Sequence, residues 1–154
     1  MKIVLTLLTI ISFFTACVDK NGFDNFGFSL QKQQWENNFI SSKIEDQNEF
    51  QGTISAVYLN KVIPEKYHNS EYFYLSIYLK DTTQKLSFTL NDEASISVKE
   101  LENNDEFQSF VQTKKQWTKY YIVEFAEQKE NDVLNFKAYN NTLSSNKMVF
   151  KKDE

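Results

Sequence analysis

The chain carries few of the side chains that most often perform chemistry. Its 154 residues include one histidine, His68, and one cysteine, Cys17. His68 lies in the polar segment PEKYHNSE, with no second histidine to complete a metal site. Zinc sites usually take three or four Cys, His or carboxylate ligands, and nucleophilic catalysis needs a nucleophile with an adjacent base. We therefore expect no metal, no cofactor and no enzymatic activity.

Carboxylates are the remaining candidates for catalysis. They cluster at Asp92-Glu93, from Glu102 to Glu106 and from Glu127 to Asp132, and a pair of carboxylates can perform acid-base hydrolysis. Each cluster lies in a predicted turn or helix start, where carboxylates usually serve solubility and capping. An envelope hydrolase is therefore the least favoured reading.

A stripe of tyrosines is the strongest indication of a binding site. Residues 71–80, EYFYLSIYLK, alternate, so that Phe73, Leu75, Ile77 and Leu79 face one way and Tyr72, Tyr74 and Tyr78 the other. Tyrosines combine a large rigid contact area with a hydrogen-bonding tip, which suits recognition of a protein or a sugar. The predicted binding residues are Tyr72, Tyr74, Tyr78, Tyr67 and His68. The alternative is that the stripe packs as core beneath the N-terminal segment, against Trp35 or Phe39.

Alternating patterns predict several further strands. They cover residues 50–59, 85–90, a short patch around Ile96 and Val98, 119–127, 133–139 and 148–151. Gly52 marks a bulge or a close approach, and the turn at residues 81–84 predicts that 71–80 and 85–90 form a hairpin. Residues 104–117 have helical spacing, with acidic residues first and lysines last, and a short helix is predicted within residues 29–43.

These elements predict a mainly β domain over residues 29–154, a small antiparallel barrel or sandwich with one helix between strands. The order of three strands, a helix and two or three strands resembles the OB-fold, a five-stranded Greek-key barrel. The resemblance is one of topology, without a sequence motif. A lipocalin-like barrel or a sandwich would give similar strands.

The N-terminus has the pattern of an export signal. Lys2 precedes an apolar run from Ile3 to Phe14, and Phe14-Thr15-Ala16-Cys17 follows. A charged start, a short apolar centre and small residues before a cleavage site are typical of secretory signals, and the run is too short to span a bilayer. An ordinary cleaved signal that leaves a free thiol, or a retained anchor helix, would be alternatives.

Residues 14–17 resemble the lipobox of bacterial lipoproteins, although Phe14 stands where leucine is commonest. The resemblance implies cleavage after Ala16 and acylation of Cys17, for example with palmitate, followed by a tether over residues 17–28. Several acyl chains anchor a protein firmly. Val18 follows the cysteine, and in the enterobacterial sorting pattern it implies the outer membrane, facing the periplasm.

The charge balance excludes nucleic acid as the expected partner. The net charge is −4, removal of residues 1–16 with Lys2 makes it about −5, and all 17 basic residues are lysines. Nucleic-acid binding relies on basic patches that neutralise phosphates. With one cysteine the domain also forms no internal disulfide, so its stability must come from packing.

Together these features predict a lipid-anchored, non-catalytic protein-binding module of the bacterial envelope. Its partner would be an envelope or periplasmic protein, which it would serve as an inhibitor, an immunity factor or an assembly accessory. The alternative is a carrier for a small ligand, a lipid or a glycan, held in the barrel interior.

The anchor can be tested by replacing the acylated residue. A Cys17→Ser variant has no thiol to acylate, so we expect it to leave the membrane fraction and to incorporate no radiolabelled palmitate. Fractionation and labelling of cells that express either form provide the measurement. A serine variant that still sediments with membranes would contradict anchoring through Cys17.

Overall fold

The computed structural model describes residues 22–102, 106–107, 109–111 and 116–152. Packing divides the chain after Leu30, and the β domain belongs to the second unit, which begins at Gln31. The predicted signal, Cys17 and the first tether residues lie outside the described residues. No helix in the described part is long and apolar enough to cross a membrane.

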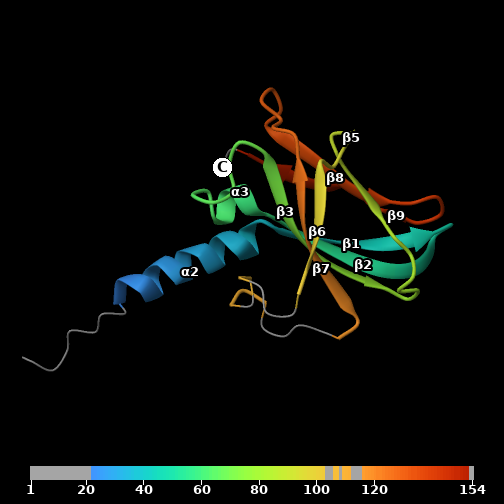
Figure 1. Ribbon diagram of the computed structural model, residues 1–154, viewed down its shortest axis with the longest axis horizontal. Helices are drawn as coiled ribbons and strands as arrows, with labels where there is room; N and C mark the ends of the chain where they lie inside the picture. Colours follow the sequence, from blue (N-terminus) through green and yellow to red (C-terminus); the bar gives the residue numbers. More distant parts are fainter. Residues whose placement is uncertain (1–21, 103–105, 108, 112–115, 153–154) are drawn as a thin grey trace, which may run out of the picture. The chain divides into compact units, whose positions relative to one another are not determined.

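Two helices and ten strands make up the described chain (Figure 1). The helices are α2 Gly22–Asn37 and α3 Leu59–Val62. The strands are β1 Phe39–Asp46, β2 Glu49–Tyr58, β3 Glu71–Leu79, β4 Ser87–Leu90, β5 Glu93–Ala94, β6 Ser97–Leu101, β7 Thr118–Phe125, β8 Val133–Tyr139, β9 Ser144–Ser145 and β10 Met148–Lys151.

The strands form one antiparallel sheet that curls into a half-barrel. Its order is β5-β4-β8-β9-β1-β2-β3-β7-β6, and β10 pairs with β8 outside this path. The sheet therefore has two ends, β5 and β6, which follow each other in the sequence.

Two tight hairpins have the same local geometry. Gln47 and Asn48 join β1 to β2, and Asn91 and Asp92 join β4 to β5, all four with positive φ. Two-residue loops with positive φ at both positions are the type I′ turns whose twist matches that of paired strands. Because the chain has only three glycines, polar residues that tolerate this conformation take their place.

The sequence predicted a bulge or a close approach at Gly52, and the structure has both there. The register between β1 and β2 shifts beside it, because Ile44 pairs with Gly52 while Glu45 pairs with Phe50. A Cβ at Gly52 would collide with the backbone oxygen of Tyr78 on β3. Gly52 therefore combines a bulge with a close approach of two strands, and a side chain there would push β2 and β3 apart.

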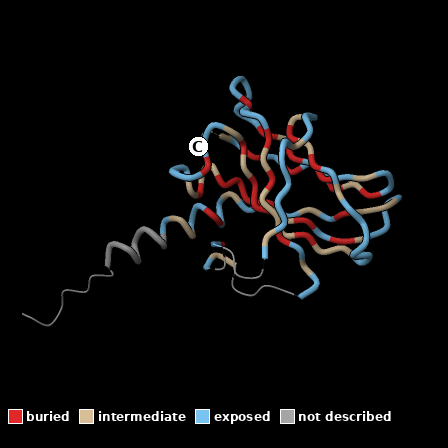
Figure 2. Tube along the Cα trace, viewed as in Figure 1, coloured by how far each residue is buried: buried red, intermediate tan, exposed pale blue. Residues whose placement is uncertain are grey.

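Buried and less buried residues alternate along several strands (Figure 2), and the buried apolar side chains form two separate clusters. The concave face forms the main core, where Phe73, Leu75, Phe125, Leu134 and Phe136 are all fully buried. The convex face forms a second cluster with Trp35 of α2 at its centre. This cluster consists of Trp35, Val57, Leu59, Val62, Tyr67, Tyr74, Phe107 and Tyr120.

The predicted mainly β, antiparallel fold class is confirmed, and so are the strands near residues 50–59, 71–80, 85–90, 119–127, 133–139 and 148–151. The predicted hairpin of 71–80 with 85–90 is wrong. β3 pairs with β2 and β7, whereas β4 pairs with β5 and β8. The loop from residue 80 to 86 thus carries the chain from one part of the sheet to another.

The helix predictions need correction at their bounds. α2 begins at Gly22, inside the segment predicted as a tether, and ends before residues 39–43, which belong to β1. Of the helix predicted over 104–117, the described residues 106–107, 109–110 and 116–117 are turns, and the rest lie outside the described residues. The helix found between strands is α3.

Candidate functional site

The tyrosine stripe does lie on one face of β3, but its centre is buried. Tyr74 is 2% exposed, with its ring 5.0 Å from that of Trp35 and 4.9 Å from that of Phe107. Packing against Trp35 is the alternative that the sequence left open for this stripe. In this arrangement Tyr74 is core and offers no contact surface to a partner.

Tyr67 and Tyr72 meet beside Tyr74. Their rings are 5.2 Å apart. The Tyr67 hydroxyl donates to Glu106 Oε1 at 2.7 Å, and Lys66 pairs with the same carboxylate. Burial raises the pKa of Glu106, but the hydrogen bonds from Lys66 and Tyr67 outweigh it and leave the pKa lowered. These contacts hold the turn at Glu106 against the sheet, so they serve the structure.

The other predicted binding residues do not join these in one surface. His68 is exposed in the loop between α3 and β3. Tyr78 is half-buried at the far end of β3, where it lines a groove on the convex face with Trp35 and Phe39. The five predicted residues are thus divided between core, loop and groove.

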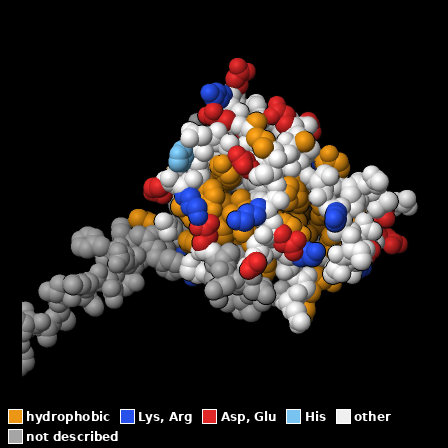
Figure 3. All heavy atoms as spheres, viewed as in Figure 1, with side chains coloured by type: hydrophobic (Ala, Val, Ile, Leu, Met, Phe, Trp, Pro, Cys, Tyr) orange, Lys and Arg blue, Asp and Glu red, His pale blue; other side chains and the backbone are white. Residues whose placement is uncertain are grey.

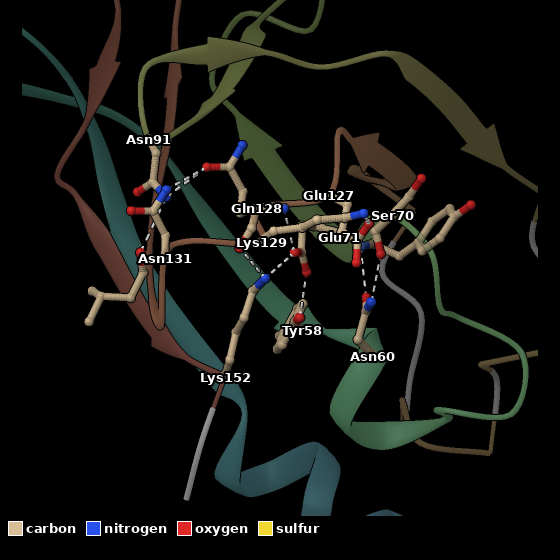
Figure 4. Close-up of polar contacts among 12 residues, drawn as sticks. Tyr58, Asn60, Ser70, Glu71, Asn91, Glu127, Gln128, Lys129, Asn131 and Lys152 are labelled. Carbon is tan, nitrogen blue, oxygen red and sulfur yellow. Dashed lines mark hydrogen bonds and ion pairs between the residues drawn. The ribbon is translucent and has the colours of Figure 1, made fainter.

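A buried carboxylate lies at the start of β3 (Figure 4). Glu71 is 2% exposed and accepts hydrogen bonds from the Tyr58 hydroxyl at 2.5 Å and from the backbone N–H of Gln128 at 2.9 Å. The Lys152 ammonium lies 2.5 Å from Glu71 Oε1. Burial, and to a smaller extent the hydrogen bond to Glu71, raise the pKa of Tyr58 well above its ordinary value.

This cluster is a structural clasp. A catalytic pair would need two acids in an open cleft, whereas Glu71 is neutralised by a lysine and enclosed. Lys152 also donates to the Gln128 carbonyl at 2.6 Å. The clasp therefore ties the loop after β7 and the end of β10 to the start of β3.

The acidic clusters also have structural contacts. Asp92 lies in the β4–β5 turn, Glu93 accepts from Gln128 Nε2 at 2.8 Å, and Glu127 pairs with Lys129. Part of the cluster from Glu102 to Glu106 lies outside the described residues. Within the described chain, no group of three His, Cys, Asp or Glu side chains could hold a metal.

The two ends of the sheet meet at one point and then diverge. The Ser95 N–H donates to the Phe88 carbonyl at 3.2 Å, and the Ile96 N–H donates to the Glu124 carbonyl at 2.8 Å. The chain therefore changes partner between these residues, from β4 to β7. Beyond this point no described strand lies between β4 and β6, and the half-barrel is open there.

A cavity of about 380 Å³ fills this opening. Its apolar walls continue the concave core and come from β3, β4, β6 and β7 and from the loop before β4. They include Ile77, Leu79, Leu86, Phe88, Val98, Trp117 and Tyr121. The volume lies in the range of small-molecule sites, which are mostly apolar with a few placed polar groups.

Charged side chains from opposite walls line the same cavity. Lys85 precedes β4 and Lys119 lies on β7, and both are exposed. Neither has an ion pair with another described residue. Glu100 on β6 is the single carboxylate in the lining. Burial, and to a smaller extent the negative charge of Glu100, raise the pKa of Tyr121. The Tyr121 hydroxyl therefore stays neutral and can donate a hydrogen bond.

Figure 3 shows hydrophobic side chains reaching the surface around β6 and β7, with charged side chains of both signs among them. Val98 is 48% exposed and Trp117 60%. The cavity can accept a molecule with an apolar body and an anionic group. The sequence suggested the barrel interior as an alternative ligand site but did not identify these lining residues, because Lys85, Val98 and Lys119 are far apart in the chain. The local signal among them was the short apolar alternation at Ile96 and Val98.

Comparison with protein-family models, with curated proteins and with solved structures gives no match for this chain. The interpretation of the site therefore depends on its chemistry alone.

The clasp makes a specific prediction about stability. Glu71→Gln leaves the Lys152 charge without its partner, so we expect the free energy of unfolding to fall by about 3–5 kcal/mol. Lys152→Met combined with Glu71→Gln removes both charges and should recover much of that loss. Urea denaturation of the three forms measures it, and a double variant no more stable than Glu71→Gln would contradict the coupling.

Proposed function

We propose that this protein is a lipid-anchored, non-catalytic binding protein of the bacterial envelope that holds a small amphipathic anion in its half-barrel. The observation that carries the proposal is the open cavity between β4 and β6, with apolar walls and two lysines that pair with no acidic side chain of the described residues. Anchoring through Cys17 is part of the proposal, supported by the lipobox-like segment before it.

The lining specifies the chemistry of the ligand. Side chains such as Phe88 and Leu79 can bury an acyl or aryl group, which gains about 25 cal/mol for each Å² of apolar surface removed from water. The two positive charges of Lys85 and Lys119 outweigh the one negative charge of Glu100, so the rim of the cavity favours an anion. A fatty acid or a similar acyl anion has both features.

Binding of decanoate tests this proposal. We expect the full-length protein in detergent to bind decanoate more tightly than decanol, because only the acid offers a negative charge to Lys85 and Lys119. Lys85→Gln and Lys119→Gln should each weaken decanoate binding about fivefold, the effect of losing one charge-assisted contact of about 1 kcal/mol. Isothermal titration calorimetry measures both effects.

Lys147→Gln is the matched control, because Lys147 is also exposed but lies outside the cavity lining. It should leave decanoate affinity unchanged. Equal affinity for decanol and decanoate, or equal losses in all three lysine variants, would rule out recognition of the anion in the cavity.

A protein partner is the second candidate, favoured by the exposure of β6. The first four residues of this end strand are exposed, and Ile96 just before it is 63% exposed. A strand at the end of a sheet offers unpaired backbone groups to which another chain can add. An inhibitor or immunity factor that binds through its sheet edge would use this strand.

This second reading predicts the effect of one surface change. Ile96→Glu places a charge beside β6 without touching the cavity lining, so it should remove a specific envelope protein from the material crosslinked to the wild-type chain. Affinity capture from crosslinked cells and mass spectrometry compare the two forms, with Cys17→Ser as the control for location. The same proteins captured by both forms would exclude β6 as the docking edge.

A further inference from the structure

The convex face of the sheet carries a second hollow, separate in chemistry from the cavity. It has a volume of about 510 Å³ and lies over β1, β2, β3 and β7. Among the residues that the structure describes, eleven side chains line it: Trp35, Phe39, Thr53, Ser55, Ser76, Tyr78, Phe110, Val111, Trp117, Thr118 and Tyr120. None of them is charged.

The floor of this groove is made of hydroxyl groups. Along the convex face of β2 and β3, the buried pair Val57 and Tyr74 is followed by Ser55 and Ser76, which pair in register, and then by Thr53 and Tyr78. The apolar face thus becomes polar within four residues of each strand. Thr53 is exposed and Ser55, Ser76 and Tyr78 are half-buried, so this polar part of the face is open to solvent and not part of the core.

Most of these hydroxyls are available to a ligand. Ser55 Oγ lies 2.7 Å from Ser41 Oγ, and a hydroxyl with one such bond can still make others. Within the described part of the chain, the hydroxyls of Thr53, Ser76 and Tyr78 have no hydrogen-bond partner in the protein. A row of hydroxyls thus faces the groove from three neighbouring strands.

Aromatic rings form the walls. Trp35 stacks on Phe110 with ring centroids 4.9 Å apart and planes 6° from parallel, which fixes one wall. Trp117 and Phe39 are exposed, 60% and 47% respectively, and offer ring surface to the groove. An aromatic face carries negative charge, so it attracts the weakly positive C–H groups of a ligand.

We propose that this groove binds a neutral oligosaccharide. A sugar ring has a C–H face that stacks on aromatic rings and hydroxyls that exchange hydrogen bonds with Ser and Thr side chains, and the groove offers both. The described residues of the lining carry no charge to compensate for burying a charged ligand, so the neutral form is favoured. The groove and the cavity share only Trp117 among their described lining residues. We therefore expect the groove to bind its ligand independently of the cavity.

Both tryptophans of the chain line the groove, so tryptophan fluorescence reports on it. The probes are chitohexaose and maltohexaose, with hexagalacturonate as the charged comparison, titrated into full-length protein in detergent. We expect one neutral hexasaccharide to bind and to change the emission, and hexagalacturonate to bind at least about tenfold more weakly, which corresponds to about 1.4 kcal/mol. Calorimetry gives the affinities.

Variants separate the groove from the cavity. Trp117→Ala should weaken binding about tenfold or more, as truncation of a stacking ring does elsewhere. Ser76→Ala removes the hydroxyl oxygen without adding any other atom, and should weaken binding by about threefold to tenfold. Val98→Ser changes only the cavity lining and should leave oligosaccharide affinity unchanged.

Thermal unfolding confirms that each variant is folded. The proposal is overturned if neither neutral hexasaccharide binds, if hexagalacturonate binds best, or if Ser76→Ala binds as tightly as the wild type. A loss in Val98→Ser alone would place the sugar in the cavity and also overturn it. Decanoate binding, measured in the same Ser76→Ala protein, shows whether the cavity works separately.

Discussion

The burial of β3 on both faces is the constraint on which the rest of this structure depends. Its concave side places Phe73 and Leu75 in the main core, and its convex side places Tyr74 under Trp35. A strand buried on both sides needs cover from two directions. The curl of the sheet supplies one cover, and α2 with the turn at Phe107 supplies the other.

This double burial also determines where hollows open along β3. Near its first residues, β3 is enclosed by the clasp at Glu71 and by the aromatic cluster around Tyr74. Toward Leu79, cover is lost on both faces, and a hollow opens on each. The concave hollow is apolar with lysines at its rim, and the convex one is uncharged and rich in hydroxyls. One strand thus lines two hollows of different chemistry because its faces alternate.

The open side of the half-barrel follows from one change of partner. Ser95 and Ile96 cross from β4 to β7, so the two ends of the sheet touch there and separate beyond it. In a closed barrel the strand edges would satisfy each other. Here the divergence leaves Phe88 and Val98 on opposite walls of the cavity, and it exposes β6. The same feature therefore favours a small ligand and, as the second candidate, a protein partner.

The sequence by itself determined the local features. Alternation identified most strands and the two faces of β3, and the position of Gly52 early in a predicted strand indicated a bulge or a close approach. These depend on neighbours within a few residues, where the period of two and the size of a side chain decide the outcome. Only the tertiary structure decided that Tyr74 is core, that β4 pairs with β8 rather than β3, and that Lys85 and Lys119 line one cavity. Strand pairing and burial depend on contacts between residues far apart in the chain, and alternation alone does not say what covers each face.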